Sequence, residues 1–387
     1  MKIYKVGGCV RDELMGKEAR DIDWLVVGAT PHELASQGYK QVGADFPVFL
    51  HPVTKEEYAL ARIERKIGLG HKGFETSFDP TVTIEEDLSR RDLTINAMAK
   101  DIETGVIVDP FGGRQDLADG ILRHVSSAFS EDPLRVLRLA RFQARTGFSV
   151  HPGTAALCSR LCADGALGEL PPERVCSELR KLLECDMPEQ GMSSLTAFGA
   201  LKSLDPQWPG RMGPSQITAL GQSAARHLPE WAKIRLACCS GQGSEASARM
   251  LEALRFPGDA IKWSTRMGGF FEWARENLED DPSDWAGACL ALERAGAPKL
   301  LPHEREAFKA CARLELDSWN ANPALVDRAM AALDAAPAIA AADLSEALAG
   351  PKQELPASVR KAKALALAHA WRSLPPPPPP PAKRPKA

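Results

Sequence analysis

Short apolar runs, separated by polar and glycine-containing segments, mark the first part of the chain. They cover residues 3–6, 24–27, 46–50 and 106–108, and helical spacing occupies the stretches between them. Runs of this length, bounded by turn-forming residues, are typical of β-strands. The pattern predicts an α+β head, a mixed β-sheet with helices, over residues 1–110.

The spacing of apolar residues changes after the head. From about residue 118 onward apolar positions recur every three or four residues, as at Leu179, Leu182 and Leu183. This is the period of a helix face, so we predict an all-α neck, body and tail. The expected parts are a helical neck at 111–185, a helical body and tail at 186–372, and a disordered proline-rich tail at 373–387.

A glycine pair followed by two acidic residues is the first candidate site. The chain reads GGCVRD and, a few residues later, RDIDW, in which Asp21 and Asp23 lie two positions apart. In an extended segment both carboxylates face one way and Ile22 is buried. Two such carboxylates suit Mg²⁺, which binds through one or two carboxylates plus substrate phosphates, and Gly8 lacks the Cβ that keeps a phosphate from the backbone. For an isolated Asp-x-Asp pair, ordinary turn or cap residues are the alternative interpretation.

A second cluster, RRDLTINAMA, occupies residues 90–99. Its arginines have the forked geometry that suits phosphate, and we expect Asn96 to reach a sugar or phosphate. The apolar residues predicted to face inward are Leu93, Ile95 and Met98.

The third cluster, SEDPLRVLRLARFQAR, occupies residues 130–145. Asp132 before Pro133 predicts a helix start, because proline is tolerated in the first helical turn. Residues three apart are neighbours on a helix, so Asp132, Arg135 and Arg138 are expected to form one polar strip. Such a strip presents acceptors and donors to a nucleobase edge, although a solvated helix face is the alternative. Leu134, Leu137 and Leu139 are expected to supply packing.

These motifs resemble those of the class II tRNA nucleotidyltransferases, the CCA-adding enzymes of bacteria. GGCVRD with RDIDW is similar to the family's nucleotide- and metal-binding motif, and RRDLTINAMA to its ribose-selecting motif. EDPLRVLRLARF resembles the helix whose Asp and Arg pair with the incoming base, and PPERVCSELRKLL, at 171–183, resembles its neck motif. The resemblance is strong over about residues 1–185.

The resemblance implies template-independent addition and repair of the 3′-terminal CCA of tRNA, with CTP and ATP as substrates and Mg²⁺ as cofactor. Asp21 and Asp23 are the implied catalytic and metal-binding residues. The residues predicted to bind nucleotide are Gly8, Arg11, Arg91, Asp92, Asn96, Asp132, Arg135 and Arg138. A poly(A) polymerase, a partial A-adding or CC-adding enzyme and a non-catalytic RNA-binding protein remain alternatives.

The segment at 42–74 is similar to the CCA-adding branch rather than to the bacterial poly(A) polymerases. Two strands are expected in it, one at Phe46, Val48 and Leu50 and one at Tyr58, Leu60 and Ile63. The basic, glycine-containing stretch between Arg62 and Lys72 then predicts a mobile loop that contacts phosphates. A solvated run of charges is the alternative.

Many enzymes of this branch also carry an HD metal-dependent phosphohydrolase domain, which requires histidines and an adjacent His-Asp pair. Between residues 200 and 302 the only histidine is His227, and residues 234–243 read IRLACCSGQG. We therefore predict that phosphatase and cyclic phosphodiesterase activities are absent and that this region is a helical body that helps to hold tRNA.

Net charge, cysteine spacing and the N-terminal residues limit the partners and the compartment that can be expected for the protein. A net charge of −3 means that RNA binding has to come from local basic patches. Nine cysteines lack the spacing of a zinc site, and the N-terminus has charged residues at Lys2 and Lys5 without a long apolar run. We expect a cytoplasmic protein with no membrane partner; protein partners and oligomeric state are not determined by these features.

Overall fold

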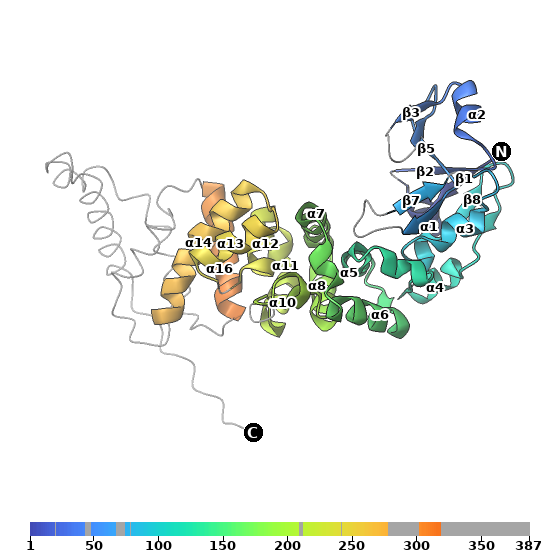
Figure 1. Ribbon diagram of the computed structural model, residues 1–387. Helices are drawn as coiled ribbons and strands as arrows, with labels where there is room; N and C mark the ends of the chain where they lie inside the picture. The colour runs from blue at the N-terminus through green and yellow to red at the C-terminus, as the bar shows by residue number, and fades with distance from the viewer. Residues whose placement is uncertain are drawn as a thin grey trace. The chain divides into compact units, whose positions relative to one another are not determined.

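The structure, a computed structural model, describes residues 1–19, 21–42, 48–66, 74–77, 79–208, 212–240, 242–277 and 302–318 (Figure 1). Contacts within the chain divide it into two compact units. The first comprises Met1–Glu178 and Ser194–Leu204, and the second comprises Leu179–Ser193 and Asp205–Ala387.

A mixed β-sheet forms the N-terminal part of the first unit. In spatial order its strands are β3 (Lys40–Val42), β4 (Val48–Leu50), β5 (Glu57–Leu60), β2 (Asp23–Val27), β1 (Lys2–Val6), β8 (Ala99–Asp101) and β9 (Ile107–Val108). Strands β2 and β5 run parallel, and the other neighbouring pairs are antiparallel. The four apolar runs of the sequence correspond to β1, β2, β4 and β9, with residues 46–47 outside the described residues. The predicted α+β head is therefore confirmed.

The two faces of this sheet have different cores. Leu25 of β2 packs in a cluster with Leu88 of α3 (Ile84–Ser89), whereas Val26 packs in a cluster with Leu34 of α2 (Pro31–Ser36). Because side chains alternate along a strand, Asp23 shares the face of Leu25. The sheet thus directs Asp23 to the α3 side.

A hairpin of β6 (Ile63–Lys66) and β7 (Phe74–Ser77) follows the central sheet. Ile63 was expected to continue the strand that holds Tyr58 and Leu60, but it begins β6 in a separate two-stranded sheet. The chain changes sheets between Leu60 and Ile63, and apolar spacing alone does not record such a break. Residues 67–73 of the predicted basic loop lie outside the described residues.

Helices and the 3₁₀ turn η1 (Thr94–Asn96), which packs against α1 and α4, build much of the rest of the first unit. Its helices are α1 (Gly8–Leu14), α4 (Gly113–Asp119), α5 (Leu134–Thr146), α6 (Pro152–Ala163) and α9 (Ala200–Leu204), and α7 (Pro172–Leu183) and α8 (Pro188–Ala197) each belong partly to the first unit and partly to the second. The expected packing residues of α5, Leu134, Leu137 and Leu139, are buried. A parallel pair of two-residue strands, β10 (Ile121–Leu122) and β11 (Ser149–Val150), was not predicted, because two residues are too few to show alternation.

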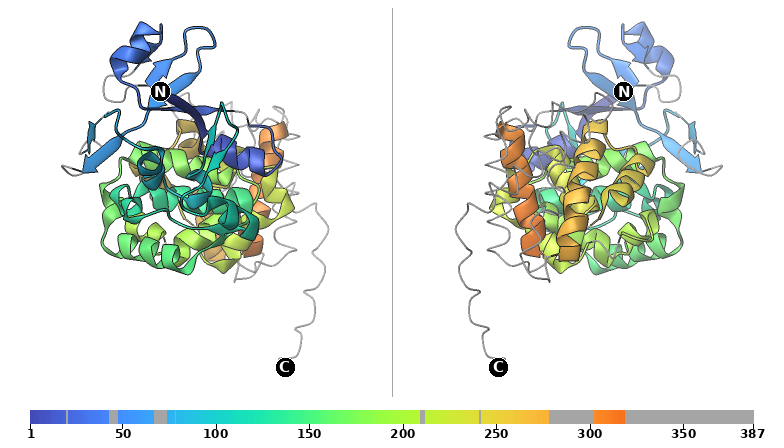
Figure 2. Two further views of the ribbon diagram at one scale, coloured as in Figure 1. Left: turned by 90° about the vertical axis from the view of Figure 1, so that its right-hand side faces the viewer. Right: turned by 90° about the vertical axis from the view of Figure 1, so that its left-hand side faces the viewer.

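In the second unit the described residues are helical, as expected. The helices are α10 (Pro214–Gly221), α11 (Ser223–Arg226), α12 (Glu230–Cys238), α13 (Ser244–Ala253), α14 (Gly258–Asn277) and α16 (Pro302–Ser318). Helices α12, α13 and α14 pack against one another, and α16, drawn in orange, packs against α12 (Figure 2). The proline-rich tail lies outside the described residues. Within the described part of the chain no helix is both long and apolar enough to cross a membrane.

Candidate active site

The glycine motif forms a sharp turn between β1 and α1. Gly7 has a φ of 75°, a value that glycine adopts far more readily than other residues. A Cβ at this position would lie 2.9 Å from Nη1 of Arg91 and 3.8 Å from Oδ2 of Asp23. The turn therefore requires glycine and brings a guanidinium and a carboxylate close to one stretch of backbone. Sequence analysis emphasised Gly8, which is the first residue of α1.

The two predicted metal-binding carboxylates lie at the start of β2. Asp23 is its first residue and pairs with Val6 of β1, and Asp21 precedes the strand. Both residues are exposed. Ile22 was expected to be buried, but it is only partly buried, against a cluster that contains Val10, because regular strand structure starts one residue later. The shared direction of the two carboxylates stays a prediction.

The chemistry of these carboxylates fits a hard divalent cation. Across the described residues, no hydrogen bond or ion pair occupies the carboxylate of Asp21 or Asp23. Exposed carboxylate oxygens are the ligands that Mg²⁺ prefers. In the same part of the chain no group of three or more His, Cys, Asp and Glu residues is positioned to hold a metal ion. Mg²⁺ usually binds through one or two carboxylates, with water and substrate phosphates as its other ligands.

A chain of buried polar contacts joins four of the predicted nucleotide-binding residues. Arg11 donates through Nη1 to Oδ1 of Asn96, and Asn96 donates through Nδ2 to Oδ1 of Asp92 at 3.1 Å. Arg138 on α5 donates to Oδ2 of Asp92 through Nε at 2.9 Å and Nη2 at 2.6 Å. The network ties α1, η1 and α5 together around the site.

Electrostatics explain why Asp92 stays charged inside this network. Burial by itself raises the pKa of a carboxyl, but Arg138, Asn96 and the backbone N–H of Leu93 outweigh it and hold the pKa of Asp92 below its ordinary value. Burial likewise opposes the charge on Arg138, and Asp92 reverses the effect and raises the pKa of that guanidinium. The side chain of Asp92 is 7% exposed and that of Arg138 is 35% exposed, so the pair reaches the surface on its arginine side.

Arg11 and Asn96 are more enclosed than the sequence suggested. Arg11 is 3% exposed and Asn96 is 6% exposed, and Arg11 also binds Asp12 through Nη2 at 2.8 Å. In this arrangement both residues hold the frame of the site. Their direct contact with a triphosphate or sugar stays a prediction.

Arg91 lies at the Gly7 turn with part of its guanidinium uncommitted. Its Nη2 forms an ion pair with Asp87 at 3.2 Å, and its side chain is 25% exposed. Its Nε is buried and has no hydrogen-bond partner among the residues that the structure describes. A buried donor without a partner is costly, and an oxygen-rich ligand at this turn would satisfy it.

The predicted strip of Asp132, Arg135 and Arg138 does not form a set of mutually paired side chains. Asp132 precedes α5, and its Oδ1 accepts from the backbone N of Leu134 at 3.1 Å, as expected near a helix start. Arg135 donates to the backbone oxygens of Ala128 and Arg90 at 2.7 and 2.6 Å, and burial lowers the pKa of its guanidinium. Each of the three side chains has a partner from a different segment.

Asp132 pairs with a residue that sequence analysis did not single out. Arg174 of α7 donates through Nη2 to Oδ2 of Asp132 at 2.9 Å. The residue lies in the quoted stretch PPERVCSELRKLL, but its partner is 42 positions earlier. Only the packing of α7 beside the start of α5 brings the two together.

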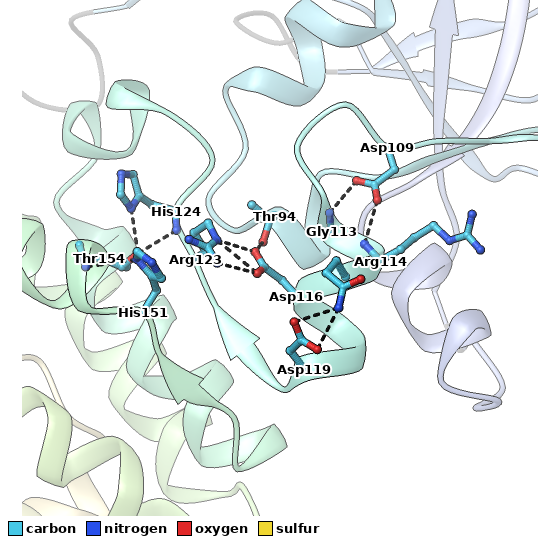
Figure 3. Close-up of polar contacts among 12 residues, drawn as sticks. Thr94, Asp109, Gly113, Arg114, Asp116, Asp119, Arg123, His124, His151 and Thr154 are labelled. Atoms are coloured by element: carbon cyan, nitrogen blue, oxygen red, sulfur yellow. Dashed lines mark hydrogen bonds and ion pairs between the residues drawn. The ribbon is translucent and has the colours of Figure 1, made fainter.

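A second polar network, also missed, supports η1 from below (Figure 3). Thr94 donates through Oγ1 to Asp116 at 2.6 Å, and Arg123 donates to the same carboxylate through Nε at 2.9 Å. The backbone N of Gly113 donates to Asp109 at 2.6 Å, and a Cβ on Gly113 would lie 2.2 Å from the backbone oxygen of Thr94. These contacts fix the segment that carries Asn96.

The segment at 234–243 contains a sealed ion pair. Arg235 of α12 donates through Nη2 to Oε1 of Glu315 at 2.9 Å, and both side chains are 0% exposed. Arg235 also donates to Ser247 at 2.8 Å and to the backbone oxygen of Gln242 at 2.9 Å. A guanidinium, rather than a metal-binding histidine, thus occupies the core at this place.

Comparison with known families and solved structures shows which proteins this chain resembles. The family described as the Poly A polymerase head domain matches residues 3–123, and the one described as the probable RNA and SrmB-binding site of polymerase A matches residues 147–209. A solved structure described as a CCA-adding enzyme with ATP has a TM-score of 0.63, with 22% identity, and covers 95% of this chain and 86% of its own. A tRNA nucleotidyltransferase solved with a primer tRNA and an incoming ATP analog has a TM-score of 0.58, with 24% identity, and covers 82% and 92%. At these identities the likeness shows a common fold.

Curated relatives give the family. The chain is 55% identical over 210 residues to the Multifunctional CCA protein of Alkalilimnicola ehrlichii, an alignment that covers 54% of this chain and 51% of that protein. It is 44% identical over 352 residues to the CCA-adding enzyme of Pseudomonas putida (strain W619). The second alignment covers 90% of this chain and 92% of the relative. A likeness of that extent, together with the motifs placed around the Gly7 turn, establishes that this chain belongs to the family of CCA-adding enzymes.

Proposed function

We propose that this chain adds and repairs the 3′-terminal CCA of tRNA without a template, using CTP and ATP with Mg²⁺ as the cofactor. The observation that carries the proposal is the pair of exposed carboxylates, Asp21 and Asp23, at the start of β2, with Asp23 close to the turn at Gly7. Family membership supports the reaction, and this arrangement of residues supports its location. The relatives named above include one solved with ATP and one solved with a primer tRNA and an ATP analog.

Asp21 and Asp23 are the residues proposed to hold Mg²⁺. A bound Mg²⁺ would neutralise charge on the triphosphate and on the leaving pyrophosphate and would favour ionisation of the attacking hydroxyl. Both side chains are exposed, so substrate phosphates can reach them. Arg91, whose buried Nε has no hydrogen-bond partner in the described part of the chain, is proposed to donate to phosphate oxygens at the same turn.

In the proposed reaction the 3′-hydroxyl of the tRNA forms a bond to the α-phosphorus of CTP or ATP. The bond from that phosphorus to the bridging oxygen of the β-phosphate breaks, and pyrophosphate leaves. The protein contributes mainly by positioning its substrates. The buried network from Arg11 to Arg138 keeps α1, η1 and α5 in fixed register, so that the carboxylate and base-reading residues act on the same nucleotide.

Reading of the base edge is assigned to Asp132 and Arg135, with Arg138 supporting their geometry. The amino groups N4 of cytosine and N6 of adenine occupy the position where uracil and guanine carry the carbonyl oxygens O4 and O6. The neighbouring ring nitrogen is a hydrogen-bond acceptor in cytosine and adenine but carries a hydrogen in uracil and guanine. A carboxylate only accepts hydrogen bonds and a guanidinium only donates them, so Asp132, which is 27% exposed, together with Arg135 suits the two bases that are added.

We also propose that the second unit lacks phosphohydrolase activity and serves as a helical tRNA-binding body. Support comes from the sealed Arg235–Glu315 pair in the core around residues 234–243, because a guanidinium repels a divalent cation. The names of the multifunctional relatives leave this activity open for the family. A phosphatase and cyclic phosphodiesterase assay with added metal tests the point, and robust activity would refute it.

The same proposal assigns the protein to the cytoplasm. Across the described residues the cysteines form no disulfide with one another, as is usual in a reducing compartment.

The proposed domains are a head at 1–110, a neck at 111–185, a body at 186–372 and a tail at 373–387.

The decisive experiment uses purified protein, Mg²⁺ and three tRNA transcripts, ending before CCA, after C and after CC. Each receives CTP, ATP or both, and the products are resolved at single-nucleotide length. Addition of C, C and A followed by a stop is expected. Long tails of A would indicate a poly(A) polymerase, addition of only C or only A would indicate a partial enzyme, and no addition would leave an RNA-binding role.

A further inference from the structure

The carboxylate of the Asp132–Arg174 pair is more exposed than that of the Asp92–Arg138 pair. The side chains of Asp132 and Arg174 are 27% and 33% exposed, whereas that of Asp92 is 7% exposed. The contact is a fork, in which Nη2 of Arg174 lies 2.9 Å from Oδ2 and Nη1 lies 3.5 Å from Oδ1 of Asp132. A ligand can therefore approach this carboxylate while the arginine holds it.

The other arginines near Asp132 are committed elsewhere. Arg135 donates to two backbone oxygens at 2.7 and 2.6 Å. Arg138 directs Nε and Nη2 to Asp92. Arg174 is the guanidinium that contacts the Asp132 carboxylate, and it comes from α7 rather than from the helix that follows Asp132.

The contact with Arg174 leaves the Asp132 carboxylate able to accept a further hydrogen bond. A carboxylate has about four acceptor positions. In Asp132, Oδ1 accepts from the backbone N of Leu134 at 3.1 Å and from Nη1 of Arg174 at the long distance of 3.5 Å. Among the described residues, Oδ2 accepts only from Nη2 of Arg174. Oδ2 thus keeps a position for an amino group.

A second ion pair joins the same two segments, one turn further along α7. Glu178 of α7 accepts from Nε of Arg141 of α5 at 2.6 Å. This pair is more enclosed, with side chains 15% and 7% exposed. This pair links α7 to α5 without contacting Asp132. A variant that removes it therefore tests the effect of weaker helix packing while leaving the contacts of the Asp132 carboxylate unchanged.

We propose that Arg174 is a positioning residue for nucleobase selection, which holds Asp132 so that its free acceptor position faces the amino group of an incoming cytosine or adenine. The inference rests on the proposed function and adds to it a residue on α7 that sets specificity through Asp132. Without the fork, the Asp132 side chain samples other rotamers and the advantage of an amino group over a carbonyl oxygen falls.

The test compares the full-length protein with its Arg174→Ala and Arg174→Lys variants. The readout is the ratio of kcat/KM for CTP over UTP on tRNA ending before CCA, and for ATP over GTP on tRNA ending in CC. We expect Arg174→Ala to lower both ratios about tenfold or more. Arg174→Lys, which keeps the charge without the fork, is expected to restore part of the loss.

Two further variants test whether Arg174 affects base selection through Asp132. Glu178→Gln removes the neighbouring α5–α7 ion pair and is expected to leave both ratios near those of the wild type. In an Asp132→Ala background, Arg174→Ala is expected to lower the ratios no further, because its influence passes through the missing carboxylate.

Three outcomes would overturn the inference. They are unchanged ratios in Arg174→Ala, an equal loss in Glu178→Gln, and additive losses in the double variant. Failure of the proposed function has a different signature, since the wild-type protein itself would then add neither C nor A.

Discussion

The ion pairs Asp92–Arg138 in the first unit and Arg235–Glu315 in the second are both made of a carboxylate and a guanidinium. They differ in how much of their side chains is exposed to water. Glu315 and Arg235 are both 0% exposed, whereas Arg138 is 35% exposed beside a buried Asp92. Asp21 and Asp23 continue the series, because they are exposed and have no partner among the described residues. The series indicates that carboxylates sealed with arginine hold the fold, and those left open are available to substrate.

The largest expected effect is on nucleotide addition and concerns the exposed carboxylates Asp21 and Asp23. Asp23→Ala is expected to reduce nucleotide addition about a thousandfold or more, because a ligand for the catalytic cation is lost, and to leave tRNA binding largely intact. Single-nucleotide extension and a tRNA binding assay measure the two quantities. Asp119→Ala, at an exposed carboxylate that accepts from Gln115 on α4, is the matched control. Retained turnover in Asp23→Ala would rule out the metal assignment.

The sealed pair is expected to dominate stability instead. Glu315→Gln leaves the charge of Arg235 buried without its counter-ion and is expected to lower the free energy of unfolding by about 3–5 kcal/mol. Urea denaturation measures the change. The double variant Arg235→Met with Glu315→Leu removes both charges and is expected to recover much of the loss. A wild-type midpoint for Glu315→Gln would contradict the comparison.

The half-open pair is expected to lie between these cases. Asp92→Asn is expected to lower the free energy of unfolding by about 1–3 kcal/mol, less than Glu315→Gln, because Arg138 can turn toward water. The pKa of Asp92 is below its ordinary value in the folded protein. Its contribution is therefore present above the unfolded pKa of about 3.9 and lost as the pH falls through the folded value.

Denaturation of wild type and Asp92→Asn at neutral and acid pH checks this sign. The difference between the two proteins is expected to shrink as the pH falls below about 4. A difference that grows under acid conditions would show that Asp92 is not held ionised by Arg138.

The smallest expected effect concerns the turn that presents the open carboxylates. Gly7→Ala and Gly16→Ala both place a side chain at a positive φ, 75° and 69°, and each is expected to cost about 1 kcal/mol in stability. Only at Gly7 would the new Cβ meet Arg91, whereas nothing lies within 4 Å of the one on Gly16. Gly7→Ala is therefore expected to raise the KM for nucleoside triphosphate as well. Equal KM values in the two variants would argue against a role for Arg91 at the turn.

The sequence predicted the head and its strands well, because period-two runs and their glycine boundaries are local signals. The apolar positions of RRDLTINAMA were also right, since Leu93, Ile95 and Met98 are fully buried. It was less informative about Ile22 and Ile63, where a strand begins later or belongs to another sheet. The roles of the candidate site residues stay predictions.

The sequence by itself determined which residue types the site contains, since the glycines, carboxylates and arginines stand in short motifs that can be read along the chain. The tertiary structure decided which of them face solvent and which are enclosed. Asp92 and Arg138 are 46 positions apart, and Arg174 and Asp132 are 42 apart. Partners at such separations leave no periodic signal, and they meet only because folding brings α5, α7 and η1 together, which also sets how much water each charge keeps.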